Sequence, residues 1–512
     1  MMEVILRFRG EPLHLPREMK SKAIGFSILA LFAQGLPASA GNAPPTNRLW
    51  WLAPAIEHAM QIHKRFPDTL FGSQTTPAAI PAFESDPDPA GLVATDQPAG
   101  ATLTASNAFF QNLGANQRTC FSCHQPQNGW AISAASVQQR FYSSLGNDPL
   151  FRLIDGATCP NSTIETYAGK ILSFRLLLTK GLIRVGLPLP SSLTMTGLVD
   201  PYQCSNNTTV NVGSTSIYSF YRRPLPSTNF FFQTSNPSNL FMWDGREPSL
   251  ISQANDATLI HAQAPTAPTS TQQTQMVSFE SGIFSAQNFS SAARSLQTQS
   301  ATGGPFALSS QPFVQGGPQP SAASLPAPFN LYTSWATLTA TDPVSAARES
   351  IARGEAIFNS TTAKSCGGCH NTVNNGNRDN AANPGIQKFF NTGLANASAT
   401  PPSAGQGITS AALADLDISG LPVFTVTCND GSNLQGSVYT VTDLGRAMIS
   451  GVCADIGAFK APSLRGLAAR APYFHNGSAA TLLNVVNFYN DNFNLGLTSS
   501  QVQDLVNFLN TL

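Results

Sequence analysis

Apolar residues at helical spacing mark the C-terminal end of the chain. Val502, Leu505 and Leu509 recur every three or four residues, which is the pattern of a helix with one buried face. Ser500 stands before this run with Gln503 three residues later, which is the spacing of a capping box. The pattern predicts a helix from about Ser500 that packs on the first helix of its domain.

Three more segments have helical patterns. Residues 107–114 and 353–358 look like short amphipathic helices that lead into a loop. Leu482, Val486 and Tyr489 belong to an apolar stripe at helical spacing. These segments predict helical structure in both halves of the chain.

Less regular stretches separate the helical segments. Residues 300–330 are rich in Pro, Gly, Ser and Gln, which predicts a long connection. Residues 125–222 form a long insertion, to which we assign no chemistry. We therefore expect a mainly α fold with long loop insertions, in two domains over residues 41–335 and 336–512.

Charge and the N-terminus limit the partners. The 28 basic and 28 acidic residues cancel, and charged residues make up only 11% of the chain. Without a basic patch, nucleic acid is not expected as a partner.

The N-terminus has the features of a cleaved signal peptide within residues 1–40. Two lysines precede an apolar run over 23–32, and Ala38-Ser39-Ala40 follows as a cleavage site, with Met19 as the true start. The run is too short for a stable membrane span, so we expect a periplasmic protein; a retained anchor is the alternative.

Two segments read Cys-x-x-Cys-His, which is the attachment signature of c-type haem. They are Cys120-Phe121-Ser122-Cys123-His124 and Cys366-Gly367-Gly368-Cys369-His370. The cysteines are expected to bind the haem covalently, and His124 and His370 to bind the iron. A zinc site would need further paired ligands, and the sequence offers none at zinc spacing. We expect two covalently bound haems.

Four cysteines remain outside the two motifs. In an oxidising compartment they are expected to form disulfides. Three pairings are open, and proximity along the chain favours Cys159–Cys204 and Cys428–Cys453. Four buried free thiols are the alternative.

Further motifs lie outside the two haem-attachment segments. They are Phe459–Gly466, Ala471–Ser478 and Trp243-Asp244-Gly245-Arg246, with Gln253 ten residues after Trp243. Together with the two haem motifs, they resemble the bacterial di-haem cytochrome c peroxidases and their MauG-type relatives over most of residues 105–512. The insertion 125–222 falls outside the resemblance. The resemblance implies two cytochrome c-like domains, the first peroxidatic and the second for electron transfer.

The resemblance also implies a sixth ligand for the second haem. In this superfamily it lies fourteen residues beyond the histidine that is His475 here, as Met in peroxidases and as Tyr in MauG-type enzymes. That position is Tyr489. A plain core role for Tyr489 stays open, and Met448 is the other candidate ligand. An anionic oxygen ligand favours ferric and higher oxidation states of iron.

In many di-haem peroxidases a histidine shortly after the first haem motif blocks the iron until the other haem is reduced. No histidine lies between His124 and His261 here, so the resemblance implies a five-coordinate first haem without this gate. His58 or His63 as a ligand is the alternative. Family members place a Gln near this haem, here Gln253, and a proton-transferring Glu ten residues later. That position is Gln263, which cannot act as a carboxylate. His261 can act as both acid and base, and Glu280 is the reserve; structural roles for both are the alternative.

Other site residues follow from the resemblance. Trp243 is expected between the two haems as a relay for oxidising equivalents, with a buried core role as the alternative. Arg246 and Arg465 are candidates to pair with haem propionates. The superfamily often holds calcium between its domains, and here Arg470 stands where the family has Thr, so calcium stays an open cofactor.

The resemblance implies a cytochrome c peroxidase-like oxidoreductase that reduces hydrogen peroxide at the first haem. Its electron donor would be a small cytochrome, a cupredoxin or a protein substrate. The alternatives are MauG-like oxidation of a partner through high-valent haem, a non-enzymatic electron carrier, and a dioxygen-using oxygenase.

Overall fold

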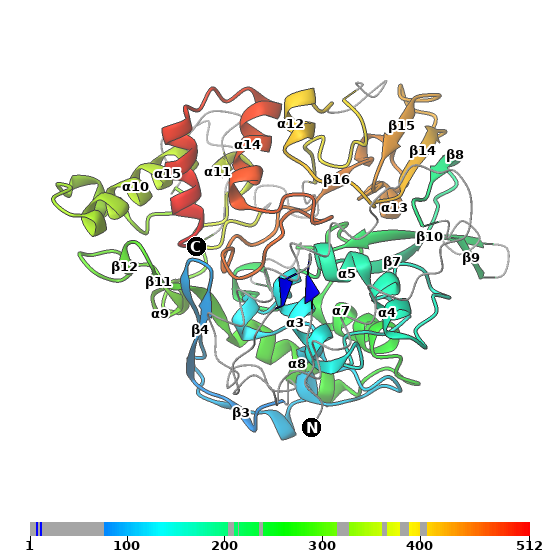
Figure 1. Ribbon diagram of the computed structural model, residues 1–512, viewed down its shortest axis with the longest axis horizontal. Coiled ribbons are helices and arrows are strands. Elements are labelled where there is room, and N and C mark those ends of the chain that lie inside the picture. Colours follow the sequence, from blue (N-terminus) through cyan, green and yellow to red (C-terminus); the bar gives the residue numbers. More distant parts are fainter. Residues whose placement is uncertain are drawn as a thin grey trace. The chain divides into compact units, whose positions relative to one another are not determined.

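The computed structural model of the chain (Figure 1) divides into two compact units, Met1–Ile62 and His63–Leu512. The expected signal peptide lies outside the described residues, apart from a hairpin of β1 (Arg7–Phe8) and β2 (Glu11–Pro12) near its start. All that follows concerns the second unit. The structure describes residues 76–202, 209–212, 215–234, 239–314, 327–360, 366–378, 389–399 and 407–512, with the backbone alone at 209–215.

Three helices pack together near the C-terminus. They are α10 (Pro343–Phe358), α14 (Leu482–Phe493) and α15 (Ser499–Leu509). The helix expected at the C-terminus is confirmed, but Thr498 caps it with Gln501, two residues before the expected pair. The predicted segment 353–358 is the last part of α10. The buried rings of Phe358 and Phe508 meet at 5.6 Å between α10 and α15, so apolar packing holds these helices together.

The contact between α10 and α15 depends on a glycine. A Cβ at Gly354 would lie 2.1 Å from the carbonyl oxygen of Asp504 and 2.7 Å from the Cβ of Phe508. Beside this contact, Ser350 and Arg353 donate hydrogen bonds to the Asp504 carboxylate. The helix axes can therefore lie this close only because residue 354 has no side chain.

Replacing Gly354 by Ala is expected to destabilise the protein by about 1–3 kcal/mol, because forced overpacking outweighs the better helix propensity of Ala. Denaturant unfolding of the haem-loaded protein measures this. Gly282→Ala is the control, because nothing lies within 4 Å of the added Cβ there. Equal stability of the two variants would contradict the prediction.

In the first half of the unit, the helix predicted over 107–114 is wrong. Only the short turn η4 (Ala108–Phe110) forms, capped by the Asn107 side chain. Phe110 then packs on Phe279 at 5.0 Å, and the chain turns so that Ala115 donates to the carbonyl of Gln263. The longer helices of this half are α3 (Ala134–Ser144), α4 (Tyr167–Ser173), α5 (Arg175–Lys180), α7 (Leu250–Asp256) and α8 (Ser270–Gly282).

The expectation of a mainly α fold is confirmed only in part, because strands make up 17% of the structure beside 34% helix. Three antiparallel sheets account for most of the strands. The first sheet has the strand order β12 (Arg294–Ser295), β11 (Phe284–Ser290), β5 (Gly91–Asp96), β4 (Phe83–Asp88). The second has the order β7 (Ile183–Pro188), β10 (Thr215–Arg222), β9 (Thr209–Val212). The third has the order β15 (Val438–Val441), β14 (Val423–Cys428), β8 (Leu193–Val199). The insertion 125–222 is therefore folded structure and not only loops.

The other described elements are short. They are β3 (Ala79–Ile80), β6 (Thr102–Leu103), β13 (Phe390–Asn391), β16 (Ala458–Phe459), α6 (Phe231–Thr234), α9 (Pro305–Ser309), α11 (Cys366–Cys369), α12 (Ser410–Ala414), α13 (Ala447–Ser450) and the turns η3 (Thr104–Ser106), η5 (Cys120–Ser122), η6 (Pro126–Asn128), η7 (Ala257–His261), η8 (Thr333–Thr337) and η9 (Cys453–Asp455).

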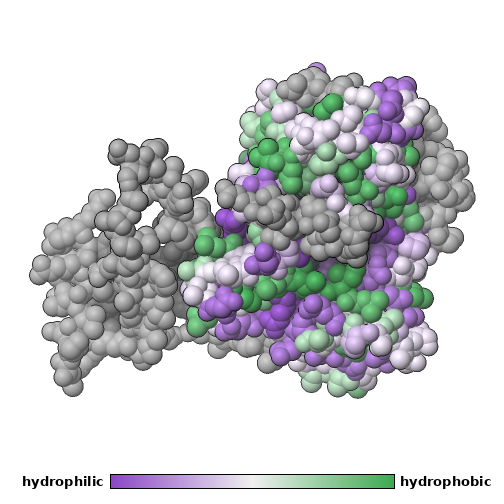
Figure 2. All heavy atoms as spheres, turned by 90° about the vertical axis from the view of Figure 1, so that its right-hand side faces the viewer, coloured by the Kyte–Doolittle hydropathy of each residue, from purple (hydrophilic) through white to green (hydrophobic). Residues whose placement is uncertain are grey.

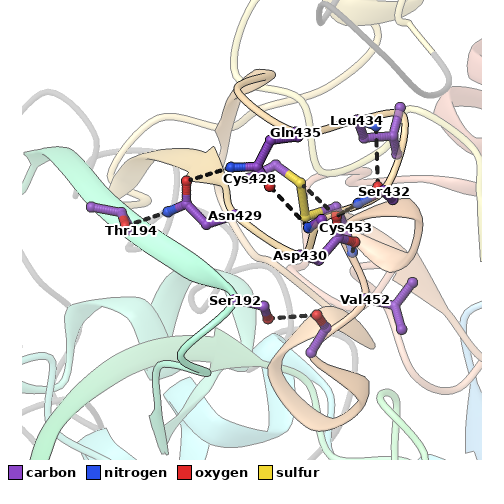
Figure 3. Close-up of a disulfide and its surroundings, with 12 residues drawn as sticks. Ser192, Thr194, Cys428, Asn429, Asp430, Ser432, Leu434, Gln435, Val452 and Cys453 are labelled. Atoms are coloured by element: carbon purple, nitrogen blue, oxygen red, sulfur yellow. Dashed lines mark hydrogen bonds between the residues drawn. A yellow bond between two sulfur atoms is a disulfide. The ribbon is translucent and has the colours of Figure 1, made fainter.

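One sheet joins the insertion to the second half of the unit. β8 pairs with β14, so that Leu198 lies opposite Phe424. The Ser192 hydroxyl donates to the carbonyl of Gly451, and the predicted disulfide Cys428–Cys453 closes the adjoining loop (Figure 3). The predicted domain boundary at residue 335 therefore lies within a single compact unit.

The other predicted disulfide is described at one end only. Cys159 is disulfide-bonded, and its expected partner Cys204 lies outside the described residues.

On the face drawn in Figure 2, hydrophobic residues (green) gather in a band across the middle. Among the described residues, no helix combines the length and the apolar character that crossing a membrane requires.

Candidate haem centres

The first Cys-x-x-Cys-His motif forms the tight turn η5, which ends at Cys123. The backbone N–H of His124 donates to the carbonyl of Cys120 at 3.0 Å. The His124 Nδ1–H donates to the carbonyl oxygen of Trp130 at 2.9 Å. A histidine held in this way presents Nε2 to a metal. Burial also lowers the pKa of His124 to about 4, which keeps the ring neutral and able to act as a ligand.

The second motif repeats this arrangement on α11. The backbone N–H of His370 donates to the carbonyl of Cys366 at 3.0 Å, and its Nδ1–H donates to the carbonyl of Gly376. Burial lowers the pKa of His370 to about 4. Both motif histidines are thus oriented by backbone carbonyls, and for His370 the carbonyl of Pro462 takes part beside that of Gly376.

The residues fit covalently bound haem at both places. Cys120 and Cys123 line one largely apolar cavity with His124, and Cys366 and Cys369 line another with His370. All four thiols are unpaired, although Cys428 and Cys453 form a disulfide in the same chain. Free thiols beside a neutral histidine and an apolar cavity are what thioether attachment of haem requires.

The first cavity brings together three predicted residues that are distant from the motif in sequence. Gln253 on α7, His261 at the end of the π-helical turn η7 and Glu280 on α8 all line the cavity beside His124. Trp243 does not line this cavity. The structure therefore gathers every candidate for proton transfer around the first motif.

His261 belongs to an ion-pair cluster that the sequence did not reveal. Its Nδ1 lies 2.6 Å from Asp155 Oδ2, and the other oxygen of Asp155 lies 2.5 Å from Arg118 Nη1. Asp155 comes from the insertion 125–222, which the resemblance does not cover. No motif in the sequence marks this carboxylate, so only the fold could reveal it.

Glu280 is buried in the same cavity. Its Oε2 has no hydrogen-bond partner among the described residues. Burial raises the pKa of Glu280 to about 7, and a hydrogen bond from Ser227 only partly opposes this shift. Near neutral pH this carboxyl can therefore both hold and release a proton.

Replacing Glu280 by Gln is expected to flatten the pH dependence of stability. Because the folded-state pKa is raised, the native protein binds the proton more tightly than the unfolded chain, and stability is lost as the pH rises from about 4.5 to about 7. The shift corresponds to at most about 3 kcal/mol. Denaturant unfolding at pH 5 and pH 8 measures the effect, with the exposed Glu165→Gln as control. An unchanged difference between the two pH values would contradict the prediction.

Tyr489 lies in the second cavity with Cys366, Cys369 and His370. Its ring packs against Phe488 at 5.1 Å and Phe493 at 5.9 Å. Its hydroxyl makes no hydrogen bond to any described residue. Burial raises the pKa of Tyr489, as do the nearby thiols. The position suits an iron ligand, which stays a prediction.

The rival ligand Met448 lies elsewhere. It is buried in the cluster around Phe424 and does not line the second cavity. In the described structure, Tyr489 is therefore the better placed of the two candidates.

Trp243 lies where the two cavities approach each other. It lines the second cavity, while the preceding residue Met242 lines the first. Its indole N–H donates to the carbonyl of Arg223 at 2.8 Å, and its ring lies 6.2 Å from that of His475. Lys460 and Pro462 line both cavities. Trp243 therefore borders the second cavity and adjoins a residue of the first, and its relay role stays a prediction.

The arginines differ in their partners. Arg246 is bound to Asp244 at 3.1 Å, so its charge is already paired. Arg465 and Arg470 are both buried. Arg465 Nη1 and Arg470 Nε have no hydrogen-bond partner among the described residues. Arg470 and Arg223 line the second cavity with no carboxylate ion pair in the described structure. Arg470, which lines the second cavity, therefore suits an anionic haem carboxylate better than Arg246 does, while Arg465 lines neither cavity.

Comparisons with known proteins agree with these motifs. Residues 458–490 match the family described as RoxA-like, cytochrome c-like. Two cytochrome-c peroxidases of Denitromonas iodatirespirans are similar: IdrP2 is 46% identical over 88 residues and IdrP1 is 45% identical over 69 residues. These regions cover 16% and 11% of this chain. The chain spans only 24% and 18% of the length of these relatives.

Two solved structures show a distant likeness. A MauG-like protein associated with microbial copper homeostasis has 15% identity and a TM-score of 0.38, over 79% of this chain and 86% of that protein. The Kuenenia stuttgartiensis hydrazine synthase has 14% identity and a TM-score of 0.29, over 74% and 93%. The sequence matches and the two Cys-x-x-Cys-His motifs support covalently bound c-type haem in this chain, and the matched segments are similar to those of cytochrome-c peroxidases.

Proposed function

We propose that this protein is a periplasmic di-haem oxidoreductase that reduces hydrogen peroxide at the haem of His124. The observation that carries the proposal is the contrast between the two cavities. The first is lined by His124 together with the proton-transfer candidates His261 and Glu280, and the second is lined by His370 together with the candidate ligand Tyr489. The N-terminal pattern and the Cys428–Cys453 disulfide support an oxidising compartment.

The roles of the residues follow from this contrast. Haem held by His124 would supply the redox chemistry for peroxide and would store the oxidising equivalents. His261 and Glu280 move protons, and Gln253 offers an amide to orient the peroxide. Trp243 lies along the route between the cavities. The electron donor is a small cytochrome, a cupredoxin or a protein substrate that reaches the surface near the second cavity.

Tyr489 favours one alternative, the MauG-like oxidation of a partner protein. An oxygen ligand stabilises oxidised iron, so the second haem would retain an oxidising equivalent instead of passing electrons at high potential. The two functions share the first step and differ in what is oxidised afterwards.

Adding one equivalent of hydrogen peroxide to the ferric protein tests the proposal. We expect one high-spin and one low-spin haem before addition, and optical and electron paramagnetic resonance changes at both after it. Two low-spin haems that do not respond would overturn the proposal in favour of an electron carrier. Reaction of the reduced protein with dioxygen alone would favour an oxygenase.

A further inference from the structure

We propose that Asp155 is a positioning residue that orients His261, so that His261 Nε2 serves as the proton acceptor in the first haem cavity. This inference rests on the proposed function and deepens it. It assigns a role to the insertion 125–222, which lies outside the family resemblance.

Each carboxylate oxygen of Asp155 has a hydrogen-bond partner. Its carboxylate is buried, with one oxygen on His261 Nδ1 at 2.6 Å and the other on Arg118 Nη1 at 2.5 Å. A carboxylate only accepts hydrogen bonds, so the proton of the neutral imidazole lies on Nδ1 and Nε2 is free. Burial alone would raise the pKa of Asp155, but the charge of Arg118 and the hydrogen bond from His261 hold it at about 2, so Asp155 stays ionised.

Arg118 is itself fixed by the fold. Its Nε donates to the carbonyl of Pro149 at 2.9 Å and its Nη2 to the carbonyl of Leu150 at 2.6 Å. Both carbonyls belong to the insertion. Arg118 stands two residues before the attachment cysteine Cys120. The cluster therefore ties the haem-binding turn to the loop that supplies Asp155.

The backbone of His261 is held as firmly as its ring. Asn116 Nδ2 donates to the carbonyl of His261 at 2.7 Å. A Cβ at Gly114 would lie 1.7 Å from the carbonyl oxygen of Ala262, so this approach needs glycine. His261 also ends a π-helical turn, a feature frequent at functional sites. The side chain is 31% exposed, and His261 lines the first cavity.

This arrangement suits proton transfer within peroxide. His261 Nε2 takes the proton from the near oxygen and returns it to the far oxygen. The O–O bond breaks, and the far oxygen leaves with the bonding electron pair as water. Two electrons from the haem centres balance the reduction. Asp155 stabilises the transient imidazolium without becoming protonated, as the carboxylate does in a catalytic triad.

The test compares Asp155→Asn with Asp148→Asn. Asp148 forms a similar buried pair with Arg140 in the same insertion, at 2.5 Å, but contacts no histidine. An asparagine at 155 can donate to Nδ1 and so favours the wrong tautomer. We expect Asp155→Asn to slow the first peroxide step by roughly 10²- to 10⁴-fold, while haem content and carbon monoxide binding, which needs no proton, stay unchanged. Asp148→Asn should change the peroxide rate by less than about threefold.

The pH profile gives a second readout. His261 is faced by Asp155 and Arg118, and His124, Glu280 and Lys460 line the same cavity. The pH dependence of the peroxide rate should differ from that of the wild type in both Asp155→Asn and His261→Gln, and it should stay unchanged in Asp148→Asn. The double variant should be no slower than His261→Gln, because the two residues act as one unit.

A measurement on the unaltered protein covers the case in which Asp155→Asn does not fold. Nitrogen-15 shifts of labelled histidine in the diamagnetic carbon monoxide form, assigned with His261→Gln, report the tautomer. A proton on Nε2 would overturn the inference.

If the wild type reacts with peroxide but Asp155→Asn matches Asp148→Asn, the inference fails and the proposed function stands. If the wild type does not react while the tautomer is as expected, only the proposed function fails. A low-spin signal lost in His261→Gln would make His261 an iron ligand and overturn both.

Discussion

Replacing Cys120 and Cys123 together by Ala is expected to leave one covalent haem where the wild type carries two, and to abolish the reaction with peroxide. Without the two thiols, no thioether bonds form at the first motif, and His124 alone holds the iron. The mass of the intact protein shows the loss of one haem. Optical titration with peroxide shows the loss of the reaction.

The matched variant replaces Cys366 and Cys369 by Ala. It should also carry one haem, because the second motif has the same chemistry. Its first cavity is intact, so peroxide should still react there, and the second oxidising equivalent should have no haem to occupy. Equal peroxide reactions in the two variants would contradict the assignment of different roles to the cavities. An unchanged mass in either would contradict haem attachment at that motif.

Replacing Tyr489 by Phe is expected to remove the sixth ligand of the second haem and raise its midpoint potential by about 0.1 V or more, within the ~0.8 V range that axial ligands cover. The ring is kept, so packing on Phe488 and Phe493 is preserved and only the oxygen is lost. An anionic oxygen favours ferric iron, so its loss favours the reduced form. Potentiometric titration and the low-spin paramagnetic signal measure the change.

Tyr473→Phe is the control for this prediction. Tyr473 lines the same cavity and is largely buried, but its hydroxyl already donates to the carbonyl of Leu467 at 3.1 Å. We expect its removal to leave the low-spin signal in place. A changed signal in Tyr473→Phe with an unchanged one in Tyr489→Phe would remove Tyr489 as the ligand.

Features that depend on residues close together in the sequence could be predicted. The attachment motifs, the helix that carries Tyr489 and the Cys428–Cys453 disulfide each depend on residues near one another in the chain. Gln253, His261 and Glu280 could be named from the resemblance and from their chemistry. Their convergence on one cavity came from the fold.

Features that depend on distant partners could not be predicted. β8 runs Leu-Thr-Met-Thr-Gly-Leu-Val, and its pairing strand β14 begins more than 200 residues later. Asp155 has no neighbours in sequence that mark it as special, because Arg118 and His261 meet it only after the insertion folds. The failed helix over 107–114 has the same origin, since its aromatic residues pack on α8 instead of on their own turn.

The pairing of β8 with β14 affects whether the second half of the protein can be produced alone or exchanged between relatives. A fragment of residues 336–512 made alone would lack β8 and expose one edge of β14, with its unpaired backbone groups. Exposed edges of this kind recruit other strands and promote aggregation. The second haem-binding half is therefore expected to be insoluble on its own unless a peptide of Leu193–Val199 is supplied. Exchange of halves between relatives would have to carry both strands together.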